Sequence, residues 1–208
     1  MRECDRLVCT MLFALALALS APSVASSPVR TDCVHDREAI LALEFKAFDQ
    51  TEGSGWRPLY HTGCYVEVAE LLREWRARTG DATPTIISFH EAQMWGYAGR
   101  YDLAEPLFAQ AFRTNGSASA VTWNLYVGGN LAFLRRDRAG LEAAVAALQN
   151  VPKPAGWDSA VDMNGNPVSL PWPANLNVLQ AMLRCWEEPY EIAAHCLIED
   201  WQRPVGPN

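Results

Sequence analysis

Residues 99–112 read GRYDLAEPLFAQAF, and their spacing decides the fold class expected for the whole chain. Apolar side chains recur there every three or four residues, which predicts an amphipathic helix over 102–113. The face they form is made of Ala104, Leu107, Phe108, Ala111 and Phe112. Gly99 allows the left-handed backbone conformation that reverses a chain between antiparallel helices. The segment therefore predicts a helical hairpin.

The same periodicity continues outward in both directions and predicts eight helices in four pairs. The expected ranges are 36–50, 65–78, 83–98, 102–113, 119–135, a short helix that begins at Asp137, 174–187 and 190–201. Residues 151–173, rich in Pro, Gly, Asn and Asp, are predicted to form a long loop. We expect residues 26–208 to form a single all-α domain, an irregular stack of about four antiparallel helical hairpins.

One unit of the chain resembles the second half of a tetratricopeptide repeat, with the pattern G-x-Y-x-x-A-x-x-x-F-x-x-A. The matching residues are Gly99, Tyr101, Ala104, Phe108 and Ala111. Weaker copies of the pattern occur elsewhere, and in them the position that corresponds to Tyr101 is 65, 138 or 190. These positions are unevenly spaced, whereas the family repeats about every 34 residues. The resemblance implies stacked hairpins in which the first helix of each pair lines a groove for a peptide or partner protein. The residues that would face this groove are Gln93, Tyr97, Tyr126 and Asn130.

The first 25 residues have the pattern of a signal peptide. An apolar run over 7–21 precedes Ser23-Val24-Ala25, which favours cleavage after Ala25, although an uncleaved short anchor remains an alternative. The run is shorter than the roughly 20 residues that a bilayer requires. The chain also resembles a group of small exported proteins of Gram-negative bacteria at WNLYV (123–127), AFLRRDR (132–138) and LPWPANL (170–176). We therefore expect a periplasmic or secreted protein without stable membrane insertion after cleavage.

Four of the six cysteines lie beyond the predicted signal peptide, namely Cys33, Cys64, Cys185 and Cys196. Four thiols in an exported chain predict two disulfides, for which three connectivities are possible. A predicted turn at 187–189 brings Cys185 close to Cys196, which leaves Cys33 to pair with Cys64. No pair has the spacing of a zinc site, so we expect no metal and no cofactor.

The net charge of −7 gives no electrostatic reason to expect binding to nucleic acid or to an anionic membrane. His90-Glu91-Ala92-Gln93-Met94 begins like the zinc-protease motif but has methionine in place of the second histidine. His90 is thus expected to be a hydrogen-bonded residue at a helix contact. We found no setting for a nucleophilic serine and no glycine-rich nucleotide loop.

The function expected from these patterns is an exported module for protein–protein interaction or scaffolding, without enzymatic activity. Eight tryptophans are unusual for this length. Trp75, Trp95 and Trp123 lie on helix faces typical of a core, whereas Trp157 and Trp172 lie in the long loop and either plug the stack or present a ligand platform. The alternative is therefore an enzyme acting on cell-wall or carbohydrate material, or a carbohydrate-binding module, that uses His90, Glu91 and the loop tryptophans.

Overall fold

The computed structural model describes residues 33–161 and 165–196, and this part of the chain is all-α. No β-strand occurs there, and one isolated antiparallel bridge pairs Val161 with Pro167 in the long loop. The predicted signal peptide and the predicted end of the last helix lie outside the described residues. No described helix is both long and apolar enough to cross a membrane.

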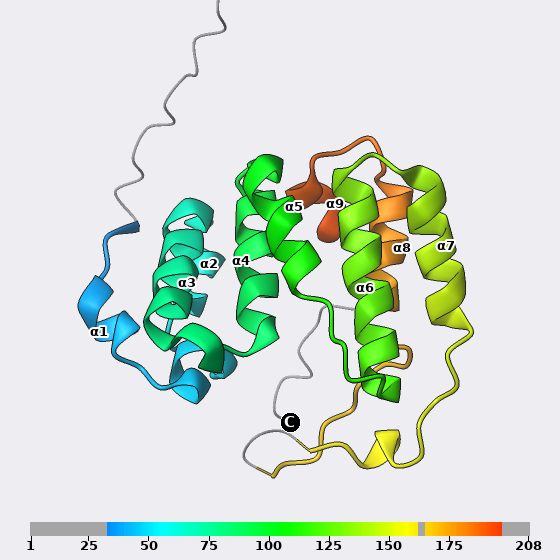
Figure 1. Cartoon of the computed structure of the whole chain (residues 1–208), viewed down its shortest axis with the longest axis horizontal. Helices are drawn as coiled ribbons and strands as arrows, with labels where there is room; N and C mark the ends of the chain where they lie inside the picture. The colour runs from blue at the N-terminus through cyan, green and yellow to red at the C-terminus, as the bar shows by residue number, and fades with distance from the viewer. Residues whose placement is uncertain (1–32, 162–164, 197–208) are drawn as a thin grey trace, which may run out of the picture.

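The helices stand roughly side by side (Figure 1). They are α1 (Arg37–Leu41), α2 (Arg57–His61), α3 (Tyr65–Thr79), α4 (Thr85–Tyr97), α5 (Tyr101–Gln110), α6 (Ala118–Leu134), α7 (Arg138–Gln149), α8 (Leu176–Arg184) and α9 (Tyr190–Ala194). The closest neighbours are α3 with α4, α4 with α5, and α6 with α7, and each of these pairs is joined by a short connection. Short connections between packed helices require them to run antiparallel.

The hairpin predicted around Gly99 is confirmed. Gly99 has φ of +72°, and the amide of Arg100 donates a hydrogen bond to the carbonyl of Trp95 at 2.8 Å. Both features are typical of a helix that ends in a left-handed residue. Ala104 and Phe108 of α5 have no exposed surface, because they pack against α4. These side chains are thus placed as the spacing predicted, whereas Phe112 is 37% exposed because α5 ends at Gln110, before the predicted end.

The chain before α3 differs from the prediction of one helix over 36–50. Helix α1 ends at Leu41, and a single π-helical turn, η2 (Lys46–Gln50), follows after a break. The indole nitrogen of Trp75 donates to the carbonyl of Leu43 at 3.0 Å, which removes that carbonyl from a helical ladder. Phe48 stacks on the same indole ring with centroids 4.8 Å apart. A contact with α3 therefore overrides the local periodicity, and α2 was not predicted at all.

Helix α9 closes the stack by packing on both α8 and α4. Figure 1 shows it in the middle of the molecule, between the α4–α5 pair and α6. A regular superhelix would instead place its last helix at the end of the row. The described residues thus form a closed bundle of hairpins rather than an extended array.

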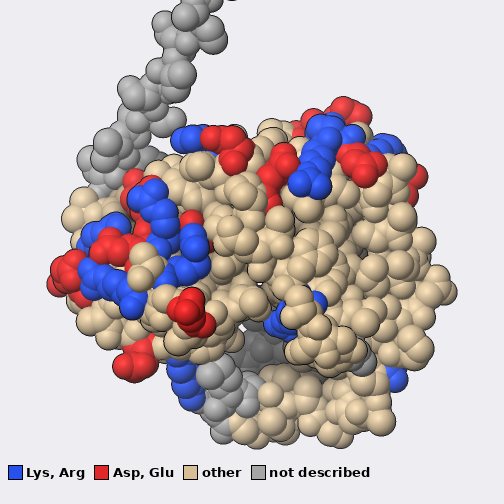
Figure 2. All heavy atoms as spheres, viewed as in Figure 1, with Lys and Arg blue, Asp and Glu red and all other residues tan. Residues whose placement is uncertain are grey.

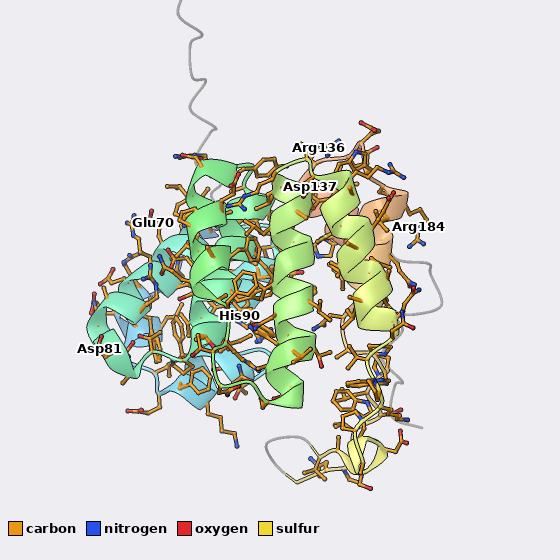
Figure 3. All side chains as sticks on the ribbon, turned by 45° about the vertical axis from the view of Figure 1, so that its right-hand side comes forward. Glu70, Asp81, His90, Arg136, Asp137 and Arg184 are labelled. Atoms are coloured by element: carbon orange, nitrogen blue, oxygen red, sulfur yellow. A yellow bond between two sulfur atoms is a disulfide. The ribbon has the colours of Figure 1, made fainter. Side chains whose placement is uncertain are left out.

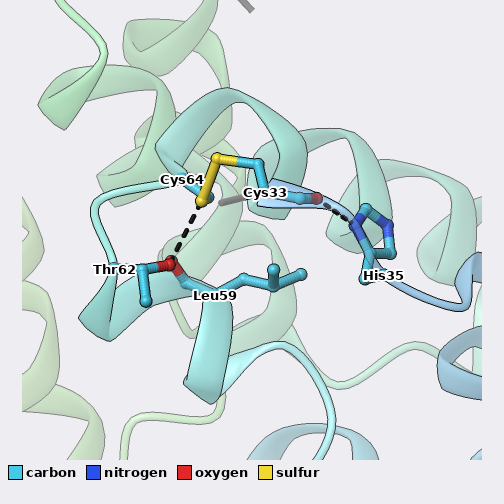
Figure 4. Close-up of a disulfide and its surroundings, with 5 residues drawn as sticks. All are labelled: Cys33, His35, Leu59, Thr62 and Cys64. Carbon is cyan, nitrogen blue, oxygen red and sulfur yellow. Dashed lines mark hydrogen bonds between the residues drawn. A yellow bond between two sulfur atoms is a disulfide. The ribbon is translucent and has the colours of Figure 1, made fainter. Parts of the chain in front are cut away.

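Two disulfides tie the ends of the described region, with the pairing that the sequence predicted. Cys33 is joined to Cys64, and Cys185 to Cys196, with Cα–Cα distances of 5.6 and 6.3 Å. Next to the first bridge the hydroxyl of Thr62 lies 3.2 Å from Sγ of Cys64, and a ring nitrogen of His35 contacts the carbonyl of Cys33 (Figure 4). The first bridge fixes the segment before α1 to the start of α3.

Charged side chains are unevenly distributed over the surface. Figure 2 shows blue and red residues gathered over α1 and α3 and along the upper edge, while the face over α6 and α7 is mostly uncharged. On the charged side, arginines of α3 pair with carboxylates of α1 and α3, as Arg78 does with Glu38 and Glu74. A binding surface on the uncharged face would therefore rely on apolar contacts and few charges.

Candidate functional site

The four predicted groove residues lie together on α4 and α6 but do not line an open groove. Asn130 has no exposed surface and Tyr126 is 5% exposed, whereas Gln93 and Tyr97 are partly exposed. None of the four lines the pocket of about 340 Å³ near the start of α6 or the pocket of about 440 Å³ between α6 and α7. Direct contact with a partner requires exposed side chains, so Tyr126 and Asn130 are not available for the predicted role in this structure.

Tyr190 of α9 fills the space in front of these residues. Its hydroxyl donates to Oδ1 of Asn130, whose amide nitrogen donates to the carbonyl of Tyr126 at 2.8 Å. Its ring stacks on that of Tyr97, with centroids 5.3 Å apart. A Cβ atom on Gly96 would lie 2.7 Å from the Tyr190 ring, so the approach requires glycine. The space is filled and its polar groups are satisfied from within the chain.

The buried hydroxyls of this cluster stay protonated. Burial raises the pKa of Tyr126 and Tyr190 well above that of a free tyrosine, because a phenolate would lose its hydration. Nearby side chains, including Gln93, lower each pKa by less than burial raises it. The cluster is therefore neutral at physiological pH, as expected for a packed core rather than an acid–base site.

His90 is hydrogen-bonded at a helix contact, as the sequence predicted. Its Nδ1 lies 2.7 Å from Oδ1 of Asp49, and the Trp56 indole nitrogen donates to the same oxygen at 3.0 Å. Figure 3 places His90 among the helices, whereas Asp81 lies at the edge. Burial alone would raise the pKa of Asp49, but the bond and charge of His90, with bonds from Trp56 and Gln50, lower it overall. His90 lines neither pocket.

Glu91, the next residue of α4, forms an ion pair with Arg76 of α3 at 2.9 Å. It is 2% exposed, and burial raises its pKa despite the neighbouring guanidinium. Like His90, it lines neither pocket. The two residues proposed for catalysis in the alternative interpretation are thus turned to different internal partners.

A pocket of about 340 Å³ does lie where the long loop meets the start of α6. Three tryptophans dominate its wall, and they come from α6 and from both ends of the loop. The lining residues are Arg113, Ser119, Thr122, Trp123, Pro154, Trp157, Trp172, Ala174 and Asn175. Concave, mostly apolar pockets with a few polar groups are the usual form of a ligand site. This tryptophan pocket is the candidate functional site.

Each indole of the pocket is held in place by a backbone carbonyl. Trp123 donates to Ala111, Trp157 to Leu170 and Trp172 to Val151, at 2.7, 2.9 and 3.0 Å. The rings of Trp157 and Trp172 meet at 68° with centroids 4.7 Å apart, so they form a corner. Because the N–H groups are already used, the rings present apolar surface in fixed orientations. A site fixed in this way loses little side-chain entropy when a ligand binds.

Arg113 is the charged residue of the lining, and it is unlike the other arginines. It follows α5, and its guanidinium lies 4.5 Å from the centroid of the Trp123 ring. Among the described arginines it is the one whose guanidinium has no carboxylate or carbonyl partner in the structure. A cation–π contact leaves the five N–H donors of the side chain unused. The pocket thus contains one positive charge that has no counter-ion among the described residues.

Metal binding finds little support in the described residues. The one group of potential ligands there is Cys33, Cys64 and Glu67, and its two sulfur atoms are bonded to each other. Disulfide sulfurs are not the thiolates that bind zinc.

Known proteins give no further guide to the site, since no family model, curated protein or solved structure matches the chain. Sequence reasoning singled out Trp157 and Trp172 but assigned Trp123 to the core, and it did not consider Arg113. In the sequence, residues 113–116 lie at the junction of two predicted helices and indicate only a turn. No sequence signal shows that the loop returns to this turn.

Proposed function

We propose that this protein is a non-catalytic binding module that captures an extended segment of a partner protein in the tryptophan pocket. The observation that carries the proposal is the corner of fixed indole rings, which is open to an apolar side chain. Tryptophan is among the residues that contribute most to protein interfaces, because its large ring buries apolar area at a small entropic cost. Val121, which precedes Thr122, and Leu170, two residues before Trp172, are also large exposed apolar side chains.

The proposed location is an oxidising compartment outside the cytoplasm. Two disulfides in a chain of this size are typical of exported proteins. The uncharged face over α6 and α7 supports contact with another protein more than with a highly charged ligand (Figure 2). We expect the partner to be another exported protein of the same compartment.

The carbohydrate-binding alternative uses the same pocket but is less well supported. Sugars stack on flat indole faces and receive hydrogen bonds from polar side chains, and here the loop rings meet at 68° with their N–H groups engaged. A corner of this kind fits a compact apolar group better than a flat sugar ring. An enzymatic role has less support still, because His90 and Glu91 are bound to internal partners.

The test is a selection of random peptides displayed on phage, carried out in parallel on the wild-type protein and on Trp172→Ala. We expect the wild type to enrich peptides that share an apolar residue at one position. Trp172→Ala should lose these peptides because it removes one wall of the corner. Ile192→Ala is the matched control, since it truncates an exposed apolar side chain of α9 outside the pocket.

Enrichment on the wild type and on Ile192→Ala, but not on Trp172→Ala, supports the proposal. Equal enrichment on all three proteins, or none on the wild type, overturns it. Circular dichroism checks that Trp172→Ala remains helical, and Trp172→Phe, which retains a ring, is expected to retain part of the enrichment.

A further inference from the structure

The electrostatics of the tryptophan pocket favour an anion. Arg113 has no counter-ion among the described residues, and no carboxylate is part of the lining. Asp158 follows the lining residue Trp157 in the sequence, but its carboxylate is already paired with Lys153. An unpaired guanidinium at the rim of an apolar pocket attracts a negative charge strongly, since few water molecules compete there.

Two helices also begin at the pocket. Ser119 and Thr122 belong to the first turns of α6, and Asn175 is the residue before the first turn of α8. The amino-terminal end of a helix carries a partial positive charge, which favours an anion nearby. These ends reinforce the charge of Arg113, although they would not define a site without it. The positive potential is local, because the chain as a whole has a net charge of −7.

The position of Arg113 also fits a bound carboxylate geometrically. Its guanidinium lies over the Trp123 ring, 4.5 Å from the ring centroid, so this contact holds the charged group at the edge of the pocket. A planar guanidinium held in this way presents its N–H groups as a fork that matches the two oxygens of a carboxylate. Stacking therefore explains where Arg113 lies, but it leaves its donors for a ligand.

We infer that the segment captured in the tryptophan pocket carries an acidic side chain, Asp or Glu, next to its apolar anchor. The anchor occupies the corner formed by Trp157 and Trp172, and the carboxylate pairs with Arg113. This inference rests on the proposed function and specifies the chemistry of the partner. It also explains why one guanidinium at this place has no carboxylate partner among residues 33–161 and 165–196, although the chain has an excess of acidic residues.

The phage selection tests the inference separately from the proposed function. Displayed peptides are fused at their carboxyl end, so a carboxylate near the anchor must come from Asp or Glu. We expect peptides enriched on the wild type to contain Asp or Glu within two positions of the shared apolar residue. Arg113→Gln should still enrich peptides with the apolar residue but without the acidic preference, and Arg113→Lys should restore part of that preference.

A second measurement uses two dyes that differ in one charged group, 8-anilinonaphthalene-1-sulfonate and the neutral N-phenyl-1-naphthylamine. Energy transfer from tryptophan reports their binding. We expect Arg113→Gln to weaken binding of the sulfonate about tenfold and to leave that of the neutral dye unchanged. Arg100→Gln, which removes an exposed arginine of a surface ion pair, should change neither.

The outcomes separate the two proposals. Peptides that share an apolar residue without any acidic preference, or equal losses for both dyes in Arg113→Gln, overturn the inference and leave the binding module intact. Absence of any enriched peptide on the wild type overturns both. An acidic preference lost in Arg113→Gln and partly restored in Arg113→Lys supports the inference.

Discussion

The space between α4 and α6 and the tryptophan pocket are built from similar residues but differ in what they leave unsatisfied. In the first, Tyr190 fills the volume, and its hydroxyl meets the amide of Asn130. In the second, three indoles are fixed around a space of about 340 Å³ and Arg113 has no counter-ion among the described residues. Aromatic and polar composition alone therefore does not mark a binding site. The useful signs are open volume and a polar group without a partner.

The largest effect that this comparison predicts is on stability when the filled space is emptied. Tyr190→Ala should lower the free energy of unfolding by about 3–5 kcal/mol, since it creates a cavity and leaves Asn130 without its partner. Urea denaturation measures the change. Tyr190→Phe, which keeps the ring, should cost only about 1–3 kcal/mol. A loss below about 1 kcal/mol for Tyr190→Ala would show that α9 does not fill this space in solution.

The next largest effect on stability is expected from substituting two glycines, Gly96 on α4 and Gly128 on α6. Gly96→Ala should destabilise the protein by about 1–3 kcal/mol, because its Cβ would lie 2.7 Å from the ring of Tyr190. Gly128→Ala is the control, as its Cβ would meet only Phe112 at 4.0 Å. This substitution in a helix interior should stabilise the protein by about 0.5–1 kcal/mol. Thermal denaturation of both variants measures the difference, and equal effects would contradict the close approach of α9 to α4.

A smaller, pH-dependent effect is expected from Asp49, another buried group whose partners are internal. Its pKa is lower in the folded protein than in the unfolded chain, so the unfolded state binds the proton more readily. This contribution to stability is present above the ordinary pKa of about 3.9 and is lost as the pH falls through the lower folded pKa. Urea midpoints between pH 6 and pH 2.5 should therefore fall more steeply in the wild type than in Asp49→Asn. Parallel curves would argue against the bonds to His90 and Trp56.

The smallest effect on stability is expected at the open pocket. Arg113→Gln should change the free energy of unfolding by no more than about 1 kcal/mol, since it removes only a stacking contact with Trp123. Arg76→Gln is the contrasting variant, because it removes the ion-pair partner of the buried carboxylate of Glu91 and should cost about 1–3 kcal/mol. Unfolding curves in guanidinium chloride measure the loss of stability in each of the two variants. A large loss for Arg113→Gln would assign Arg113 a structural role.

The helices that the sequence predicted well are those whose ends have local signals. Helix α7 begins after Asp137, whose side chain accepts from the amide of Gly140 at 2.9 Å, and α4 ends at the turn of Gly99. The break after α1 depends on a hydrogen bond from Trp75, which is 32 residues from Leu43. Local periodicity contains no information about a contact of that range, so a continuous helix was predicted there.

The candidate site was predictable only in part for the same reason. The composition of 151–173 marked Trp157 and Trp172 as unusual, and the structure places them at the pocket. Trp123 and Arg113 join them because the loop returns to the start of α6, which is a tertiary event. The groove residues were assigned from the geometry of a repeat family, and that geometry changes here because α9 folds back onto α4. Tyr126 and Asn130 are therefore poor choices for testing binding, since Asn130→Ala would disturb the core.

The return of α9 to α4 has a consequence for how the protein unfolds. In a linear array each hairpin contacts only its neighbours, and such arrays can lose their end units one at a time. Here the backbone amide of Tyr190 donates a hydrogen bond to the hydroxyl oxygen of Tyr101, 89 residues earlier in the chain. Detaching the last helix exposes the faces of α4 and α6 together, which couples the two halves. We expect a single cooperative transition, seen as coincident loss of helix and tryptophan signals.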